Sequence, residues 1–208
     1  MGLMINLENP TYISARHQRK GRRKPVQLIV IHSMEAPEGR HTAEAIARYF
    51  QRGPVIASAH YCVDAISFVQ CVWDGDTAYH CKNANSNGIG IEHAGYARQT
   101  CEQWLDGYGI DMLNISAQIA AYLCNKFNIP VARAEFKATD DPTVVKRGFC
   151  GHVDVPNHGH HWDPGQGFPW DWYLGRVAHY EGYISGTSYP TLGDETTNEE
   201  PITWLENP

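Results

Sequence analysis

Histidine and carboxylate side chains gather in three short stretches that lie far apart in the sequence. The first is IVIHS at 29–33, where His32 ends an apolar run. The second is NGIGIEHAG at 87–95, which places Glu92 in an otherwise apolar segment. The third is GHVDVPNHGHHWDPGQGFPWDW at 151–172, which contains His152, Asp154, His158, His160, His161 and Asp163. With 11 histidines in 208 residues, the chain is rich in the side chain that most often binds metals and carries protons near neutral pH.

Imidazole and carboxylate groups together form the ligand set of catalytic zinc sites, which take three protein ligands and leave a fourth position for water. One histidine from a strand end, with a histidine and a carboxylate from the third stretch, meets that requirement. Spacing alone leaves these ligands open, because several histidines compete and a lone strand-end histidine is commonly structural. Glu92 needs a partner, a metal or a cleft, since burial of an unpaired carboxylate is costly.

Hydrophobic patterning predicts the elements that position these stretches. Apolar or alternating residues indicate strands at 26–32, 59–64, 67–73 and 87–93. Apolar residues at helical spacing predict helices at 42–51, 112–127 and 169–179. We therefore expect an α/β fold, a single domain with a central mixed β-sheet flanked by helices.

Charge divides the chain into three parts. Residues 1–24 carry six positive charges between Arg16 and Lys24 and are expected to form a basic N-terminal extension, either a solvated leader or a patch for an anionic polymer. Residues 183–208 contain no Lys or Arg and are expected to form an acidic C-terminal tail. The functional domain is then expected at 25–182.

Overall composition excludes several classes of protein. Hydrophobic residues make up 42% and charged residues 19%, so wholesale disorder is excluded. A net charge of −6 is typical of proteins that do not bind nucleic acid. No apolar run approaches the length of a membrane span, and no apolar stretch precedes the basic cluster, so synthesis in a cytoplasm without a signal peptide is expected. The six cysteines form no C-x-x-C pair and are expected to be buried thiols, although Cys62 and Cys71 lie on neighbouring predicted strands.

Six segments in this order resemble the zinc-dependent N-acetylmuramoyl-L-alanine amidases of the type-2 amidase family. They are IVIHS (29–33), SAHYCVD (58–64), TAYHC (77–81), NGIGIEHAG (87–95), GHVDV (151–155) and WDPGQGFPWDW (162–172). That family includes peptidoglycan recognition proteins, muropeptide-recycling amidases and phage endolysins. The resemblance implies zinc-dependent hydrolysis of the amide between N-acetylmuramic acid and L-alanine in peptidoglycan.

The resemblance also implies roles for individual residues. His32, His152 and Asp163 match the zinc ligands, and Glu92 matches the catalytic acidic residue of the recycling-type enzymes. His161 stands where the family usually has Lys, so it would stabilise the oxyanion as a protonated ring or through one neutral N–H.

Three further residues are candidates for substrate binding. The resemblance places His80 beside the bound glycan or stem peptide, while Trp162 is a candidate sugar platform and Asn85 a candidate cleft residue. Asp154 either orients His152 or caps the following turn.

These features favour a phage endolysin, made in the host cytoplasm, that acts on the cell wall after release. Its expected partners are Zn²⁺ and bacterial peptidoglycan, and it is expected to be a monomer without nucleic acid or stable membrane insertion. A cytoplasmic muropeptide-recycling amidase is the alternative enzyme, but the terminal extensions and the polar connection at 133–149 favour the endolysin. A non-catalytic peptidoglycan-binding module is disfavoured, because such relatives typically lose a zinc ligand. A purely structural zinc would need a fourth protein ligand, such as His160.

Overall fold

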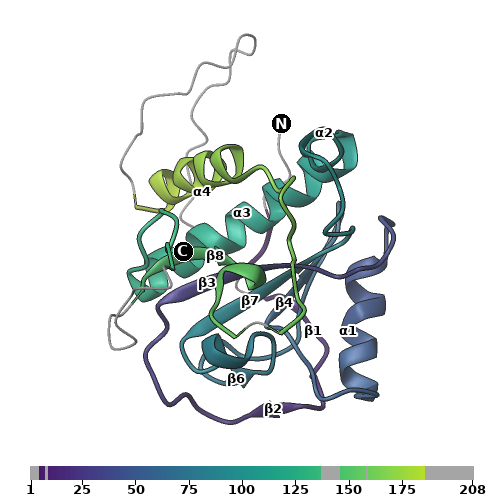
Figure 1. Ribbon diagram of the computed structural model, residues 1–208, viewed down its shortest axis with the longest axis vertical. Helices are drawn as coiled ribbons and strands as arrows, with labels where there is room; N and C mark the ends of the chain where they lie inside the picture. Colours follow the sequence, from purple (N-terminus) through teal and green to yellow (C-terminus); the bar gives the residue numbers. More distant parts are fainter. Residues whose placement is uncertain (1–4, 8, 137–145, 158, 186–208) are drawn as a thin grey trace, which may run out of the picture.

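A six-stranded mixed sheet lies at the centre of the computed structural model, which describes residues 5–7, 9–136, 146–157 and 159–185 (Figure 1). The strand order is β1, β5, β4, β7, β3, β8, and all neighbours are parallel except β4 and β5. The strands are β1 (Thr11–Tyr12), β3 (Leu28–Ser33), β4 (Tyr61–Val63), β5 (Phe68–Gln70), β7 (Gly88–His93) and β8 (Gly148–Gly151). The expected mixed sheet is confirmed.

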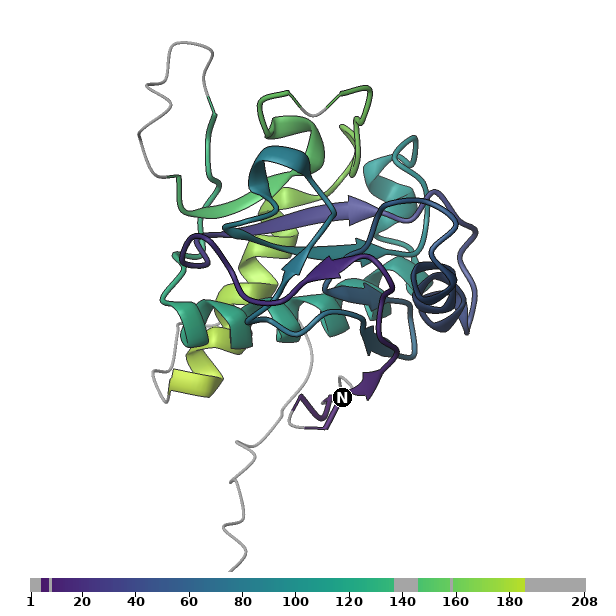
Figure 2. The same ribbon diagram turned by 90° about the horizontal axis from the view of Figure 1, so that it is seen from below.

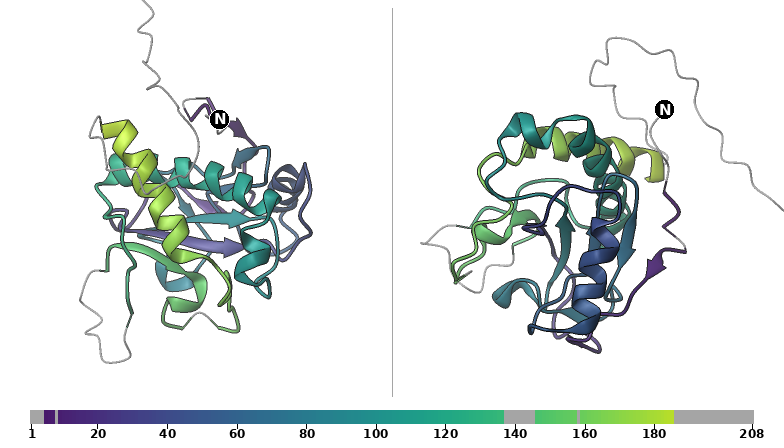
Figure 3. Two further views of the ribbon diagram at one scale, coloured as in Figure 1. Left: turned by 90° about the horizontal axis from the view of Figure 1, so that it is seen from above. Right: turned by 90° about the vertical axis from the view of Figure 1, so that its right-hand side faces the viewer.

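Helices cover both faces of this sheet. On one face, α3 (Gly107–Phe127) and α4 (Trp170–Ser185) pack against each other, and Figure 3 shows them crossing above the strands. On the other face, α1 (Thr42–Arg52) packs against β4 and β5. The short elements are β2 (Gln18–Arg19), β6 (Thr77–Ala78), α2 (Cys101–Trp104) and the 3₁₀ turns η1 (Lys82–Ala84) and η2 (His152–Asp154). Strands β2 and β6 form a separate antiparallel pair.

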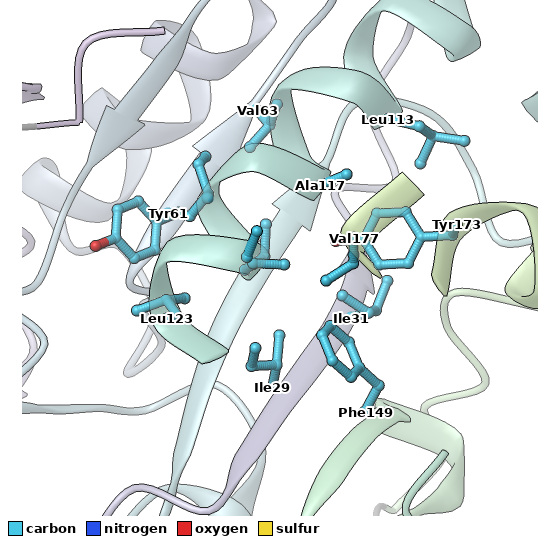
Figure 4. Close-up of a cluster of buried hydrophobic side chains, with 14 of the residues drawn as sticks. Ile29, Ile31, Tyr61, Val63, Leu113, Ala117, Leu123, Phe149, Tyr173 and Val177 are labelled. Carbon is cyan, nitrogen blue, oxygen red and sulfur yellow. The ribbon is translucent and has the colours of Figure 1, made fainter. Parts of the chain in front are cut away.

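Successive side chains along the central strands point alternately to the two faces of the sheet. One set, which includes Ile29 and Ile31 of β3, packs with Tyr173 and Val177 of α4 in the main core (Figure 4). Burial of each large apolar side chain contributes about 1.5–3 kcal/mol. His32 directly follows Ile31, so its side chain points to the opposite face. The register therefore places His32 of β3 and Glu92 of β7 on the face away from α3 and α4.

Most predicted elements are present with shifted ends. The helix predicted at 112–127 begins five residues earlier, at Gly107, because Asp106 caps it by accepting a hydrogen bond from the Gly109 N–H at 2.8 Å. The helix predicted at 169–179 continues to Ser185. The two strands predicted at 59–64 and 67–73 form a hairpin, which Asp64 closes by accepting from the backbone of Ile66 and Ser67. Strands β1, β2 and β6 are too short for a periodic pattern and were not predicted.

The basic N-terminal segment is part of the fold. In the view from below it runs across the underside of the molecule (Figure 2), where β1 pairs with β5 and β2 pairs with β6. Arg22 is partly buried and donates to the carbonyl oxygens of Asp74 at 2.6 Å and Gly88 at 3.1 Å. Burial lowers the pKa of Arg22 to about 10. With these contacts, the segment is not the solvated leader that its composition favoured. The domain start at residue 25 stays a prediction.

Further predictions concerned the cysteines, membrane spans and the C-terminal tail. Five cysteines are buried thiols and Cys101 is exposed; the Sγ atoms of Cys62 and Cys71 lie 3.8 Å apart. Among the described helices, none combines the length and the apolar character that crossing a bilayer requires. Of the predicted acidic tail at 183–208, residues 186–208 lie outside the described residues, as do residues 137–145 of the polar connection.

Replacement of Arg22 by Met is expected to destabilise the protein by at least about 2 kcal/mol, because two carbonyl groups lose their donor at about 1–3 kcal/mol each. Urea denaturation measures the free energy of unfolding. The matched control is Arg23→Met, because Arg23 is exposed and has no partner among the described residues; its effect should stay within about 0.5 kcal/mol. Equal effects of the two substitutions would show that the Arg22 contacts do not stabilise the fold.

Candidate metal centre

Three side chains from two distant parts of the sequence converge at one point above the sheet. His32 lies near the end of β3, His152 begins η2 directly after β8, and Asp163 lies in the loop before α4. His32 Nδ1 is 2.8 Å from Asp163 Oδ2, and His152 Nδ1 is 3.4 Å from Asp163 Oδ1. All three side chains are buried, and one ligand atom from each lies within 4.8 Å of the others. Among the described histidines of the third stretch, His152 is the one that belongs to this group with His32.

The charge states of these residues fit a bound metal ion. Burial acts to raise the pKa of Asp163, but hydrogen bonds with His152 and His32 outweigh it and hold that pKa far below its usual range. Burial lowers the pKa of His32, although Asp163 opposes this shift. An ionised carboxylate and neutral imidazoles are the forms that ligate metals. Two imidazoles and one carboxylate form the ligand set of open, catalytic zinc sites.

His80 supports His32 from behind. Its Nδ1 lies 3.1 Å from His32 Nε2, on the ring edge that points away from Asp163. Burial lowers the pKa of His80 well below its usual value, so the ring is neutral at pH 7. Gly90 makes room for this ring, because a Cβ at position 90 would lie 2.6 Å from His80 Cγ. Asn85 orders the same turn, since its Oδ1 accepts from the N–H groups of His80 at 2.9 Å and Cys81 at 2.7 Å.

A buried polar chain supports His32 from the other side of the sheet. His93 Nδ1 lies 3.0 Å from the carbonyl oxygen of His32, and His93 Nε2 lies 2.7 Å from Ser116 Oγ of α3. Ser116 Oγ is in turn 2.7 Å from the hydroxyl of Tyr173 on α4. Burial lowers the pKa of His93 to about 4, so this chain is uncharged at neutral pH. Nothing in the sequence pattern links His93 to Ser116 and Tyr173, so this chain was not predicted.

Glu92 lies beside His32 on the neighbouring strand. The two residues are in register between β3 and β7, so their side chains point to the same face. The Glu92 side chain is partly buried, and within the described part of the chain no donor forms a hydrogen bond to its carboxylate. Burial raises its pKa well above the usual value, and the negative charge of Asp163 raises it further. A carboxyl group of this kind, aimed at a metal site, is suited to proton transfer.

The loop that carries Asp163 also brings His161 and Trp162 to the site. The ring of His161 stacks on that of His152 at 4.1 Å, and its Nδ1 is 3.6 Å from Asp163 Oδ1. The His161 side chain is 63% exposed and Trp162 is 53% exposed, so both are open to a ligand. His160 is exposed and is not among the clustered ligand groups of the described residues.

Asp154 caps a turn and, in the part of the chain that the structure describes, forms no hydrogen bond with the His152 ring. Its Oδ2 accepts from the Gly151 N–H at 2.7 Å and forms an ion pair with Arg133 at 2.6 Å. Of the two roles left open for Asp154, the contacts favour ordering of the backbone at His152. Arg133 was missed from the sequence, because its partner lies across an irregular connection.

Comparison with known proteins bears on the same residues. The model of the family described as N-acetylmuramoyl-L-alanine amidase matches residues 22–166, a span that includes every candidate site residue. N-acetylmuramoyl-L-alanine amidase A of Achromobacter lyticus is 29% identical over 158 residues, which are 72% of this chain and 81% of that protein.

Solved structures show the same fold. The Staphylococcus aureus hydrolase AmiA superposes with a TM-score of 0.66 at 14% identity, covering 88% of this chain and 87% of its own. AmpD gives a TM-score of 0.60 at 17% identity, covering 84% of this chain and 99% of its own. A mutant endolysin from Bacillus subtilis gives 0.56 at 18% identity, covering 81% and 98%. At these identities the likeness establishes the architecture alone.

We expect three substitutions to differ in how strongly they lower zinc affinity, which is measured by competition with a chromogenic chelator. Asp163→Ala removes a ligand and should cost more than the roughly 10–100-fold typical of a supporting partner. His80→Phe removes such a partner and should fall within that range. His160→Ala should leave zinc affinity unchanged. Loss of zinc in His160→Ala would instead indicate a closed, structural site with four protein ligands.

Proposed function

The chain belongs to the N-acetylmuramoyl-L-alanine amidase family, and we propose that zinc bound by His32, His152 and Asp163 is its cofactor. The enzyme hydrolyses the amide bond between N-acetylmuramic acid and L-alanine in peptidoglycan. The observation that supports zinc most directly is the convergence of two histidine Nδ1 atoms on one buried carboxylate. When bound, zinc acts as a Lewis acid that polarises the scissile carbonyl and makes a nearby water more acidic.

Glu92 is proposed as the general base. Its carboxylate accepts a proton from the attacking water as the new carbon–oxygen bond forms, and returns it to the nitrogen of L-alanine as the carbon–nitrogen bond breaks. The raised pKa of Glu92 suits both steps, because it brings the carboxyl closer to neutral pH. A bound cation would moderate this shift through its positive charge.

The residues around the ligands are proposed to have complementary roles. His161, stacked on His152, donates an N–H to the charge that develops on the carbonyl oxygen. Trp162 contacts substrate from its exposed position. His80 and Asn85, predicted as substrate-binding residues, use polar atoms on His32 and on the backbone, which favours a supporting role for both.

We propose that the enzyme acts as an endolysin on intact peptidoglycan, and that it is a monomer. His161 and Trp162 are exposed beside the buried ligands, which suits a long polymer strand lying across the site. The endolysin from Bacillus subtilis and AmpD share the architecture, so the fold alone does not separate wall lysis from turnover of soluble muropeptides. A recycling enzyme therefore remains the second candidate.

Glu92→Gln should retain zinc but lose roughly 10²–10⁴-fold in kcat, the range for removal of a general acid–base group. The change is nearly isosteric and removes only the basic oxygen. Rates on a defined muropeptide, together with zinc content by mass spectrometry, check both parts. More than a tenth of the wild-type rate at full zinc occupancy would exclude Glu92 as the base.

Digestion of purified sacculi should release new N-terminal L-alanine, detectable by mass spectrometry. A zinc chelator should stop the release, and added zinc should restore it. The parallel reaction uses soluble disaccharide peptides at equal bond concentration. Faster cleavage of sacculi supports an endolysin, whereas cleavage confined to the soluble substrate would favour a recycling enzyme.

A further inference from the structure

A cavity of about 690 Å³ opens beside the metal ligands. Val153 follows His152, while Trp162 and Pro164 flank Asp163, and all three line the cavity. The rest of the lining includes residues 97–99, Arg133 and Trp170. Its volume lies within the roughly 300–1,000 Å³ of small-molecule sites. The hydrolytic roles assigned above use none of this space apart from Trp162.

Two guanidinium groups lie at this cavity, and each lies over an aromatic ring. Arg133 lies 3.6 Å from the centre of the Trp170 ring, and its charge is matched by Asp154 at 2.6 Å. Arg98 lies 4.0 Å from the centre of the Tyr96 ring. Arg98 is exposed and forms no ion pair with any carboxylate among the described residues. The Arg98 guanidinium is therefore oriented by the Tyr96 ring, but no described carboxylate pairs with its charge.

Two carboxylates that share a hollow with Arg98 are already engaged. Glu38 and Asp106 line a second hollow on which Arg98 also borders. Glu38 accepts from the side-chain amide of Gln99 at 2.8 Å, and Asp106 accepts from the Gly109 N–H at 2.8 Å. The Arg98 guanidinium thus keeps its donors for a ligand, in a geometry that favours a bidentate carboxylate.

The loop that bears Arg98 is pressed against the loop that bears Asp163. A Cβ at position 165 would lie 1.7 Å from the carbonyl oxygen of Ala97, so only glycine fits there. Gly165 also has φ +90°, which disfavours any side chain. Arg98 follows Ala97 directly, and Asp163 lies two residues before Gly165. This contact couples the position of Arg98 to that of the metal ligand.

The glycan side and the peptide side of the scissile amide differ in the free carboxylates that they carry. The lactyl carboxyl of N-acetylmuramic acid is consumed in the scissile amide, so the glycan side has no carboxylate at this point. The stem peptide carries its next free carboxylate on the D-glutamate that follows L-alanine, unless that group is amidated. An unmatched guanidinium beside the site therefore complements the peptide side.

We propose that this cavity is the stem-peptide subsite and that Arg98 binds the free α-carboxylate of the second stem residue. The inference rests on the proposed function. It makes Arg98 a specificity residue that separates stem peptides with D-glutamate from those with D-isoglutamine.

The test uses two disaccharide tripeptides that differ only in this carboxylate or its amide. Wild type should prefer the carboxylate substrate in kcat/KM by about 10–100-fold, the range for a charge-assisted hydrogen bond. Arg98→Gln should remove most of this preference, chiefly by slowing the carboxylate substrate. Arg98→Lys, which keeps the charge without the fork, should be intermediate. Arg23→Gln, which removes an exposed charge outside the cavity lining, is the control.

Binding of the two free tripeptides by calorimetry gives a second readout that does not require hydrolysis. Weaker binding of the carboxylate peptide alone in Arg98→Gln supports the subsite. An equal loss for both peptides, or no loss, would overturn it and would move the cavity to the glycan side or to no substrate role. Hydrolysis of neither substrate by wild type would count against the proposed function, and the binding difference would still decide the subsite.

Discussion

The buried carboxylate of Asp163 is the constraint on which the site depends. It lies between two imidazoles that reach it from β3 and from the turn after β8, and His32 precedes it by 131 residues in the sequence. An isolated carboxylate at this depth would be costly, and the two rings make it tolerable. A divalent cation would satisfy all three groups together. The same arrangement thus serves stability before metal binding and ligation after it.

Both layers of the fold converge on His32. His80 reaches its ring from the face that carries the site, while His93 reaches its carbonyl oxygen from the face covered by α3 and α4. Burial keeps both supporting histidines neutral at pH 7, so neither adds positive charge close to a cation site. The central strand therefore transmits the packing of the helix layer to His32, the proposed metal ligand. Ser116 and Tyr173 take part in positioning without lying near the substrate.

Local sequence signals predicted the parts of the molecule that depend on local physics. A continuous apolar run indicated β3, alternating Gly and Ile residues indicated β7, and apolar residues four apart indicated α3. Glu92 was identifiable because a carboxylate in an apolar strand needs a compensating environment, and the structure places it beside His32. Resemblance selected His152 and Asp163 where spacing left several histidines open. Contacts between distant segments, such as the one between Arg22 and Gly88, produce no periodic pattern in the sequence. The two-residue strands were missed for the same reason, since their pairing partners rather than their own residues define them.

The short N-terminal strand has a consequence for the state of the protein in solution. Strand β1 is only two residues long, yet it occupies the outer side of β5, the margin of the sheet farthest from β8. A bare margin offers unpaired backbone groups to other molecules, and a brief pairing segment is one of the ways in which proteins block such self-association. Trimming the chain to the start of β3 would remove this cover from β5. The shortened enzyme would then be prone to aggregate even with every metal ligand in place.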